Sequence, residues 1–262
     1  MPPSTSPAAG FADGVGYLAQ AATLLATERR LWRYLAIPMV VTLLAGIALY
    51  AALLALATTV VAWLTPLLPL FLTPFGLLLN LVLGLLMLWV TGILLAKFGV
   101  ILGSPWYGQL AAEIERMRLP AAEIPEAPQG AAAFAHDIYL AVLYELKKTG
   151  LVLAIGLPAL LLNLIPGVGQ LASGAVWTAL GATTLVLDFV DPALQRRRLP
   201  FRRKLALIAS QAPASAGFGL PALVLAGIPI VNLLTVPLCM AAGTLYYTDR
   251  LHAGLLPPGE PR

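Results

Sequence analysis

Three arginines stand close together near the N-terminus, directly before the first long apolar stretch: Arg29, Arg30 and Arg33. Each guanidinium can donate two parallel hydrogen bonds to an oxyanion. The apolar stretch predicts a helix, and a helix N-terminus attracts anions through its free N–H groups and its dipole. The pattern indicates an anion site, or else the ordinary basic anchor of a membrane-spanning helix.

A second basic cluster lies in the last third of the chain, with six positive charges in the nine residues Arg196–Lys204. Clusters of this kind attract the headgroups of anionic lipids, at about 1 kcal/mol per basic residue. We therefore expect anionic lipids to bind there. The alternative is that these residues concentrate anions at the mouth of a pore.

Several polar residues interrupt the apolar stretches. Asn163 and Asn232 each lie near an Ile-Pro turn, and their roles are either turn and cap formation or lining a pore constriction. The same alternatives apply to Gln170, Ser173 and Thr244. Glu113 and Glu115, beside Arg116, form a gate or proton site, or else lie on a solvated helix face.

The sequence contains no catalytic or metal-binding motif, whether H-E-x-x-H, G-x-S-x-G or a Walker lysine. His136 and Asp137 are adjacent, so on a helix they point about 100° apart and form no dyad. Cys239 is the one cysteine, which rules out a disulfide within the chain. We expect no enzymatic activity, no catalytic residue, no cofactor, no metal and no nucleic-acid partner.

Composition identifies the class of protein. Of the 262 residues, 60% are hydrophobic and 11% are charged, against about 25% charged in soluble domains. No charge occurs in Tyr34–Ala96, Thr149–Leu187 or Leu205–Thr248, and each range exceeds the about 20 apolar residues that cross a bilayer. These ranges are continuously apolar, which excludes a strand-based barrel. The sequence predicts an all-α integral membrane protein that crosses the membrane more than once.

The first half predicts three helices. In residues 11–27, Phe11, Val15, Leu18, Ala22 and Leu25 share one face, which predicts an amphipathic helix in the membrane interface. Tyr34–Leu64 predicts a long spanning helix, ended by the proline-rich segment 65–76. A second long helix runs from Leu77, bends near Gly103-Ser104-Pro105 and emerges at Glu113–Arg118. Residues 119–130 predict a connector in water.

The second half predicts two helical hairpins of similar design. An amphipathic stretch at 133–148 leads into the limb Thr149–Ile165, a turn at 166–169 and a limb that ends near Asp188. The second hairpin turns at 228–230 and ends at Asp249-Arg250. Its limb Ala214–Gly227 measures about 21 Å as a helix, less than the about 30 Å core, which favours hairpins that penetrate only in part. Residues 10–254 form one membrane domain between disordered tails at 1–9 and 255–262.

The distribution of charge predicts the orientation in the membrane. The turns at 65–76, 166–169 and 228–231 carry no charge, whereas the lysines and arginines lie at the opposite helix ends. By the positive-inside rule, those basic ends are cytoplasmic.

Four motifs in order resemble the CysZ-type sulfate permeases, which share a domain with the etoposide-induced membrane proteins. The resemblance runs from about Gly10 to Asp249. The motifs are Ser104-Pro105-Trp106-Tyr107-Gly108, Ile165-Pro166-Gly167-Val168-Gly169-Gln170, Asp191 ahead of Leu199-Pro200-Phe201, and Ile228-Pro229-Ile230-Val231-Asn232 followed by Pro237 and Ala242-Gly243-Thr244.

The resemblance implies an oligomeric inner-membrane protein with two long spanning helices and two partly penetrating hairpins, which takes up sulfate for cysteine synthesis. It implies a sulfate site at neighbouring arginines before a Leu/Ile-Pro. Arg33 occupies the second arginine position ahead of Ile37-Pro38, whereas Trp32 replaces the first. Arg29 and Arg30 are the candidates to substitute for it.

Two questions about function stay open at this point. Moving a dianion inward against 100 mV costs about 4.6 kcal/mol, so a passive channel needs a steep sulfate gradient or a coupled proton. The long apolar ranges hold no carboxylate, which favours a channel-like permease. The alternative is a membrane-organising or scaffold protein that uses its hairpins as wedges and transports nothing.

Overall fold

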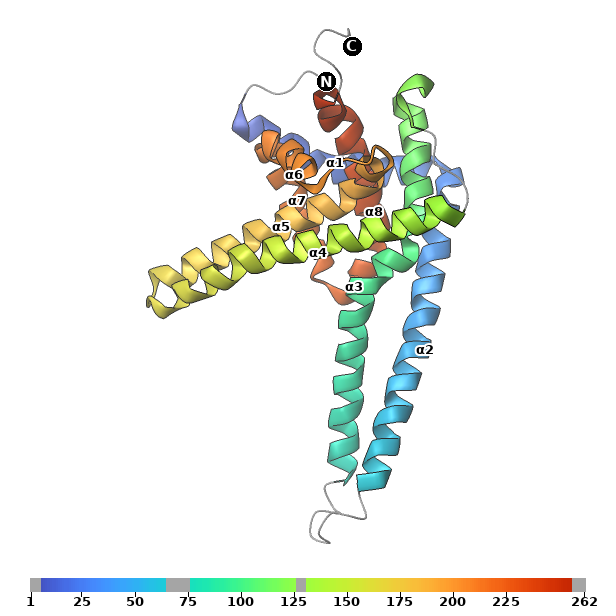
Figure 1. Ribbon diagram of the computed structural model, residues 1–262, viewed down its shortest axis with the longest axis vertical. Helices are drawn as coiled ribbons and strands as arrows, with labels where there is room; N and C mark the ends of the chain where they lie inside the picture. The colour runs from blue at the N-terminus through green and yellow to red at the C-terminus, as the bar shows by residue number, and fades with distance from the viewer. Residues whose placement is uncertain (1–5, 65–75, 126–130, 256–262) are drawn as a thin grey trace. The chain divides into compact units, whose positions relative to one another are not determined.

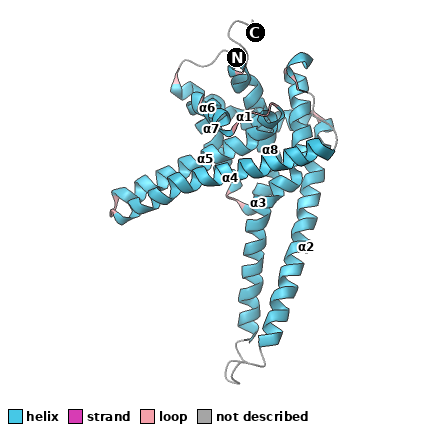
Figure 2. Cartoon of the chain, viewed as in Figure 1, coloured by secondary structure: helices cyan, strands magenta, loops and turns pink. Residues whose placement is uncertain are grey.

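The computed structural model describes residues 6–64, 76–125 and 131–255, and within these ranges the chain is helical with no strand (Figures 1 and 2). The long helices carry large apolar side chains on their exposed faces, and two of them are long and apolar enough to cross a membrane. The prediction of an all-α membrane protein is confirmed. The chain divides into two compact units, Arg33–Trp106 and the remainder.

The unit Arg33–Trp106 contains most of α2 (Trp32–Leu64) and of α3 (Gly76–Arg118). At 1.5 Å per residue, the 33 residues of α2 measure about 50 Å, which exceeds the about 30 Å core of a bilayer. This confirms the long helix predicted at Tyr34–Leu64. The predicted turn at 65–76 lies outside the described residues, except for Gly76. α3 is one continuous helix through Gly103-Ser104-Pro105, where a bend was predicted. The boundary between the two units lies just after this segment, between Trp106 and Tyr107.

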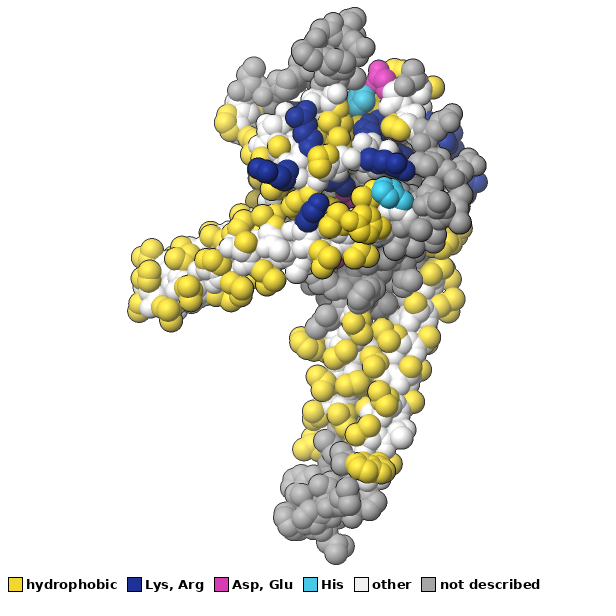
Figure 3. All heavy atoms as spheres, in the orientation of Figure 1, with side chains coloured by type: hydrophobic (Ala, Val, Ile, Leu, Met, Phe, Trp, Pro, Cys, Tyr) yellow, Lys and Arg dark blue, Asp and Glu magenta, His cyan; other side chains and the backbone are white. Residues whose placement is uncertain are grey.

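The remaining unit includes a long hairpin made of α4 (Ala131–Leu161), the 3-10 turn η5 (Leu162–Leu164) and α5 (Val168–Arg196). The predicted amphipathic stretch and apolar limb form one continuous helix, α4. Gly167 closes the tip with φ of +77°, a conformation that suits glycine. Figure 3 shows that hydrophobic side chains cover the described surface of this hairpin toward its tip.

Three shorter helices follow: α6 (Phe201–Ser210), α7 (Ala212–Ala226) and α8 (Pro229–Tyr246). The chain bends by 100° between α6 and α7, so this pair is a broken span or a re-entrant segment. The 15 residues of α7 measure about 22 Å, too short to cross the apolar core alone. A π-helical turn η6 (Tyr247–Leu251) and a 3-10 turn η7 (His252–Gly254) end the described chain.

α1 (Pro7–Thr27) packs against α7 and α8. It begins inside the predicted tail 1–9, because Ser6 caps it by accepting a hydrogen bond from the Ala9 N–H at 3.2 Å. Phe11 and Val15 of the predicted apolar stripe are exposed, and a different face of α1 packs against the protein. The buried residues of α1 are Gly10, Gly14, Tyr17, Ala21 and Leu25.

Close backbone contact explains this choice of face. A Cβ atom at Gly14 would lie 2.1 Å from the carbonyl oxygen of Ala214, and one at Gly217 would lie 2.0 Å from that of Phe11. The two helices approach so closely only because both positions lack a side chain. Beside this contact, the Tyr246 ring packs against Tyr17 and Phe218, at centroid distances of 5.4 and 6.0 Å.

Candidate anion site and the buried charge cluster

The arginines of the predicted anion site lie where α1 ends and α2 begins. Arg29 and Arg30 belong to a 3-10 turn, η1 (Arg29–Leu31). The Arg30 side chain is 54% exposed and lies between two carboxylates, with its Nε atom 3.3 Å from Glu28 Oε2 and its Nη1 atom 3.2 Å from Glu113 Oε1. The structure therefore joins a predicted anion-site residue, Arg30, to a predicted gate residue, Glu113.

The other two arginines of the predicted site, Arg29 and Arg33, are both exposed. The Arg33 guanidinium lies over its neighbour's ring, 4.6 Å from the Tyr34 centroid, and donates a hydrogen bond of 2.6 Å to the Tyr34 hydroxyl. Trp32, which stands where the resemblance implies a first arginine, donates from its indole N–H to the Leu25 carbonyl at 2.8 Å. Trp32 thus ties the start of α2 to the end of α1, which is a structural role.

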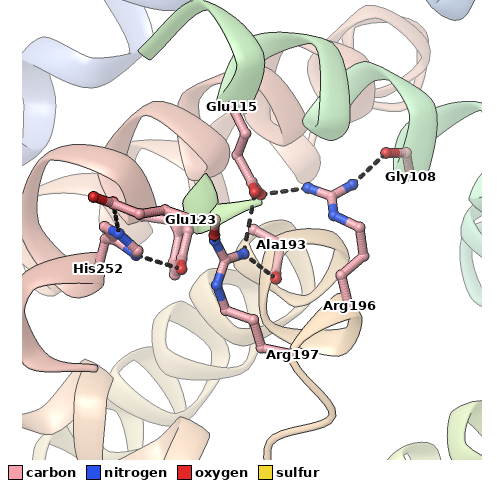
Figure 4. Close-up of polar contacts among 8 residues, drawn as sticks. Gly108, Glu115, Glu123, Ala193, Arg196, Arg197 and His252 are labelled. Atoms are coloured by element: carbon pink, nitrogen blue, oxygen red, sulfur yellow. Dashed lines mark hydrogen bonds and ion pairs between the residues drawn. The ribbon is translucent and has the colours of Figure 1, made fainter. Parts of the chain in front are cut away.

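Glu113 and Glu115 have opposite environments although only one residue separates them. Glu113 is 18% exposed and also accepts from Arg116, at 3.2 Å. Glu115 is fully buried, and both of its oxygens are bound: one by Arg196 Nη2, the other by Arg197 Nη1 at 3.1 Å. Figure 4 shows the carboxylate between the two guanidinium groups. The alternative of a solvated face is therefore wrong for Glu115.

Further contacts extend this cluster around Arg197. Its Nη2 atom donates to the Glu123 carbonyl at 2.9 Å, and its guanidinium lies 4.8 Å from the Tyr247 ring centroid. The Tyr247 hydroxyl lies 3.0 Å from His252 Nδ1, and His252 Nε2 lies 2.6 Å from the Glu123 carboxylate (Figure 4). Burial raises the pKa of the Tyr247 hydroxyl, which keeps it a neutral partner. The cluster joins the ends of α3 and α5 to the C-terminal turns.

The structure divides the second basic cluster into two groups. Arg196, Arg197 and Lys204 are partly or fully buried in ion pairs, the last with Asp191. Arg198, Arg202 and Arg203 are exposed. Three of the six basic residues at Arg196–Lys204, where anionic lipids are predicted to bind, are therefore already held in ion pairs. A similar pair lies nearby, where Lys148 Nζ contacts both oxygens of Asp188 at 2.8 and 3.0 Å.

The predicted pore residues lie in different environments. Asn163 donates from its side chain to the Leu160 carbonyl and to Ser173 Oγ, both at 3.1 Å, which fits the turn-forming role. Gln170 is exposed near the start of α5. Thr244 is buried and donates to the Met240 carbonyl at 2.8 Å. Asn232 lies in α8, and its side chain falls outside the described residues.

No group of three metal-ligating side chains occurs in the part of the chain that the structure describes.

These features define the class: an all-α integral membrane protein whose spanning helix begins at a group of arginines. Residues 17–237 match the family described as sulfate transporter CysZ/etoposide-induced protein 2.4. The match covers most of the chain, so the chain belongs to this family.

Curated relatives are similar to parts of the chain. The sulfate transporter CysZ of Salmonella typhimurium is 26% identical over 148 residues, which are 56% of this chain and 57% of that protein. The sulfate transporter CysZ of Pseudomonas syringae pv. tomato is 26% identical over 162 residues, 62% and 63% of the two chains. The sulfate transporter CysZ of Pseudomonas aeruginosa is 29% identical over 103 residues, which are 39% of this chain and 42% of that protein. The chain thus spans less than two thirds of the length of each relative.

Proposed function

We propose that this protein is a sulfate permease of the bacterial inner membrane that supplies cysteine biosynthesis. The observation that carries the proposal is the group Arg29, Arg30 and Arg33 at the start of a helix long enough to span a membrane. Guanidinium groups bind tetrahedral oxyanions through charge and paired hydrogen bonds. Membership of the family and its relatives named sulfate transporter support the choice of sulfate.

Arg30 gives the site a way to open. Its present partners are the carboxylates of Glu28 and Glu113, which occupy the positions that sulfate oxygens would take. Because Arg30 is half exposed, exchanging these carboxylates for a dianion carries only a modest desolvation penalty. Glu113 is then the gate: it holds Arg30 in the absence of sulfate and leaves it when the anion arrives.

The rest of the proposal concerns the path. The permease is channel-like and acts as a homo-oligomer, since one chain has few full spans with which to enclose a pore. The basic helix ends face the cytoplasm. Gln170, Asn163, Asn232 and Thr244 are the candidates for polar positions along the path; of those whose side chains are described, Gln170 and Asn163 are exposed and Thr244 is buried. Catalysis plays no part.

Uptake of radiolabelled sulfate into proteoliposomes tests the proposal. We expect uptake above that of empty liposomes, reduced in Arg30→Ala/Arg33→Ala. The matched control is Arg118→Ala, which removes an exposed arginine from the C-terminal end of α3. Equal uptake by the double variant and the control would place the anion site elsewhere. Absence of flux from a folded, inserted protein would refute the permease.

One observation favours a second function, that of a membrane-organising scaffold. The α4–α5 hairpin exposes large apolar side chains near its tip, among them Leu161, Leu164 and Leu171. A hairpin of this kind inserted into one leaflet acts as a wedge. Deformation of vesicles by the wild-type protein without sulfate flux would favour the scaffold, and flux without deformation would favour the permease.

A further inference from the structure

A pocket of about 260 Å³ lies where α4, the end of α5 and the start of α6 meet. Its wall from α4 includes Leu140, Leu143 and Lys147, and the loop between α5 and α6 contributes Arg198 and Leu199. Tyr144 and Phe201, whose rings meet edge to face at 5.8 Å, also line it. The pocket thus has an apolar side and a basic side.

The basic side carries uncompensated positive charge. Lys204 lines the pocket, but it is paired with Asp191 and lies 4.9 Å from the Tyr144 ring centroid. Lys147 and Arg198 are exposed and have no ion-pair partner within the described part of the chain. The lining residues include no acidic side chain. Two cations are therefore available to an anionic group.

The apolar side of the pocket indicates whether the anion is a free inorganic ion or carries an acyl chain. Leu140, Leu143 and Leu199 are partly exposed in the pocket, and on α4 the neighbouring Val142 and Leu146 are largely exposed. Figure 3 shows basic side chains over the α6 region close to hydrophobic ones. A free inorganic anion gains nothing from such a surface, whereas an acyl chain does. The combination fits an anionic amphiphile.

The backbone of Arg198 is a third, separate observation. Its φ of +50° makes it the one residue other than glycine with a positive φ among the described residues. It follows the C-terminus of α5, where glycine is the usual residue, because a side chain in this conformation costs about 1 kcal/mol or more. The fold therefore tolerates strain in order to carry a guanidinium at this position, which is the rim of the pocket.

We propose that this pocket binds the headgroup of an anionic phospholipid. Lys147 and Arg198 hold the phosphate, and the leucines of α4 and the loop contact the first part of an acyl chain. Binding at this site is separate from sulfate transport and uses different arginines. It also replaces diffuse attraction by the whole segment Arg196–Lys204 with a defined site, since Arg196, Arg197 and Lys204 are already paired.

A lipid titration of the full-length protein in neutral detergent tests this site. Phosphatidylglycerol, phosphatidylcholine and inorganic phosphate are each titrated while the melting temperature is followed. The variants are Lys147→Ala and Arg198→Gly, the second of which suits the positive φ and so preserves the fold. Arg202→Ala is the matched control, because Arg202 is exposed on α6 and does not line the pocket.

We expect phosphatidylglycerol to raise the melting temperature of the wild type and of Arg202→Ala at the same lipid concentration. Lys147→Ala and Arg198→Gly should each need about fivefold more phosphatidylglycerol for the same rise in melting temperature. This factor corresponds to the loss of one basic contact with the lipid. An equal effect of inorganic phosphate would assign the site to a free anion and overturn the proposal. So would an equal effect of phosphatidylcholine, equal losses in Arg202→Ala, or no stabilisation of the wild type.

Discussion

Two groups of arginines, alike in the sequence, have opposite environments in the structure. In the first, Arg29 and Arg33 are exposed and Arg30 is half exposed between two carboxylates. In the second, the side chains of Arg196 and Arg197 are only 14% and 10% exposed and enclose the fully buried Glu115. The first group is thus exposed to its surroundings, whereas the second is buried in ion pairs between helices.

Solvation explains why the two groups differ in use. Removing one partner of a buried ion pair leaves an uncompensated charge and costs about 3–5 kcal/mol, whereas an exposed pair contributes about 0–1 kcal/mol. The proposed anion site therefore uses Arg30, whose side chain is half exposed, and not Arg196 and Arg197, which enclose a buried carboxylate. Whether an arginine can bind an anion thus depends on how deeply its side chain is buried, and not on its neighbours in the sequence.

The largest effect is expected from Glu115→Ala. It leaves Arg196 and Arg197 buried around an empty position, so we expect a loss of about 3–5 kcal/mol in the free energy of unfolding. Thermal or denaturant unfolding in detergent measures it, with Glu113→Ala as the matched control. A loss no larger than that of the control would contradict the distinction between buried and exposed groups.

A similar contrast applies within α6. Lys204→Ala removes the partner of Asp191 and should destabilise the protein by about 3 kcal/mol, because Asp191 is largely buried. Arg202→Ala changes an exposed position two residues away and should stay within about 0.5 kcal/mol. Unfolding of the two variants in parallel gives the comparison, and equal stabilities would show that the Lys204–Asp191 pair contributes little.

The exposed group should affect binding without affecting stability. Arg30→Ala/Arg33→Ala should unfold within about 1 kcal/mol of the wild type, since both side chains are exposed. Sulfate at 100 times its Kd should stabilise the wild type by about 2.7 kcal/mol and the double variant by much less. Melting curves with sulfate, against chloride at equal ionic strength, measure the effect. Undiminished stabilisation of the variant would remove these arginines from the site.

The smallest effect is expected from Glu113→Gln, which removes one of the two carboxylates at Arg30. Since an exposed ion pair contributes about 0–1 kcal/mol, the sulfate concentration for half-maximal stabilisation should fall by up to about fivefold. Glu145→Gln, which alters the ion pair with Lys148, serves as a control distant in sequence. A weaker response to sulfate in Glu113→Gln would mean that Glu113 supports the site instead of competing for it.

The helices were predictable from the sequence because continuous apolar ranges leave the backbone no other way to satisfy its hydrogen bonds in lipid. α2 is helical through Leu64, the last described residue before the proline-rich segment, in agreement with the long helix predicted there. The buried face of α1 was not predictable by hydrophobicity, because contact with α7 selects small residues over large ones. Gly14, which counts against a helix in isolation, is the position where the two backbones meet.

Within the candidate site, the sequence indicated the arginines but not their partners. Glu113 and Glu115 are two residues apart, so on a helix they point about 200° apart and only one can face the interior. That spacing was a usable signal that one of them would be buried. The identity of the buried one, and its pairing with Arg196 and Arg197, depends on contacts between segments about 80 residues apart. Local pattern carries no information about such contacts.

The close approach of α1 to α7 at Gly14 and Gly217 has a consequence for the time at which the protein can fold. At about 5–20 residues per second, the ribosome makes α7 roughly 10–40 s after α1, because about 200 residues separate them. Arg250, which pairs with Asp13, is made later still. Throughout this interval the glycine-lined face of α1 has no partner within its own chain. Completion of the fold therefore waits until α7 has been made, and a ribosome that stalls before α7 leaves the N-terminal helix without its packing surface.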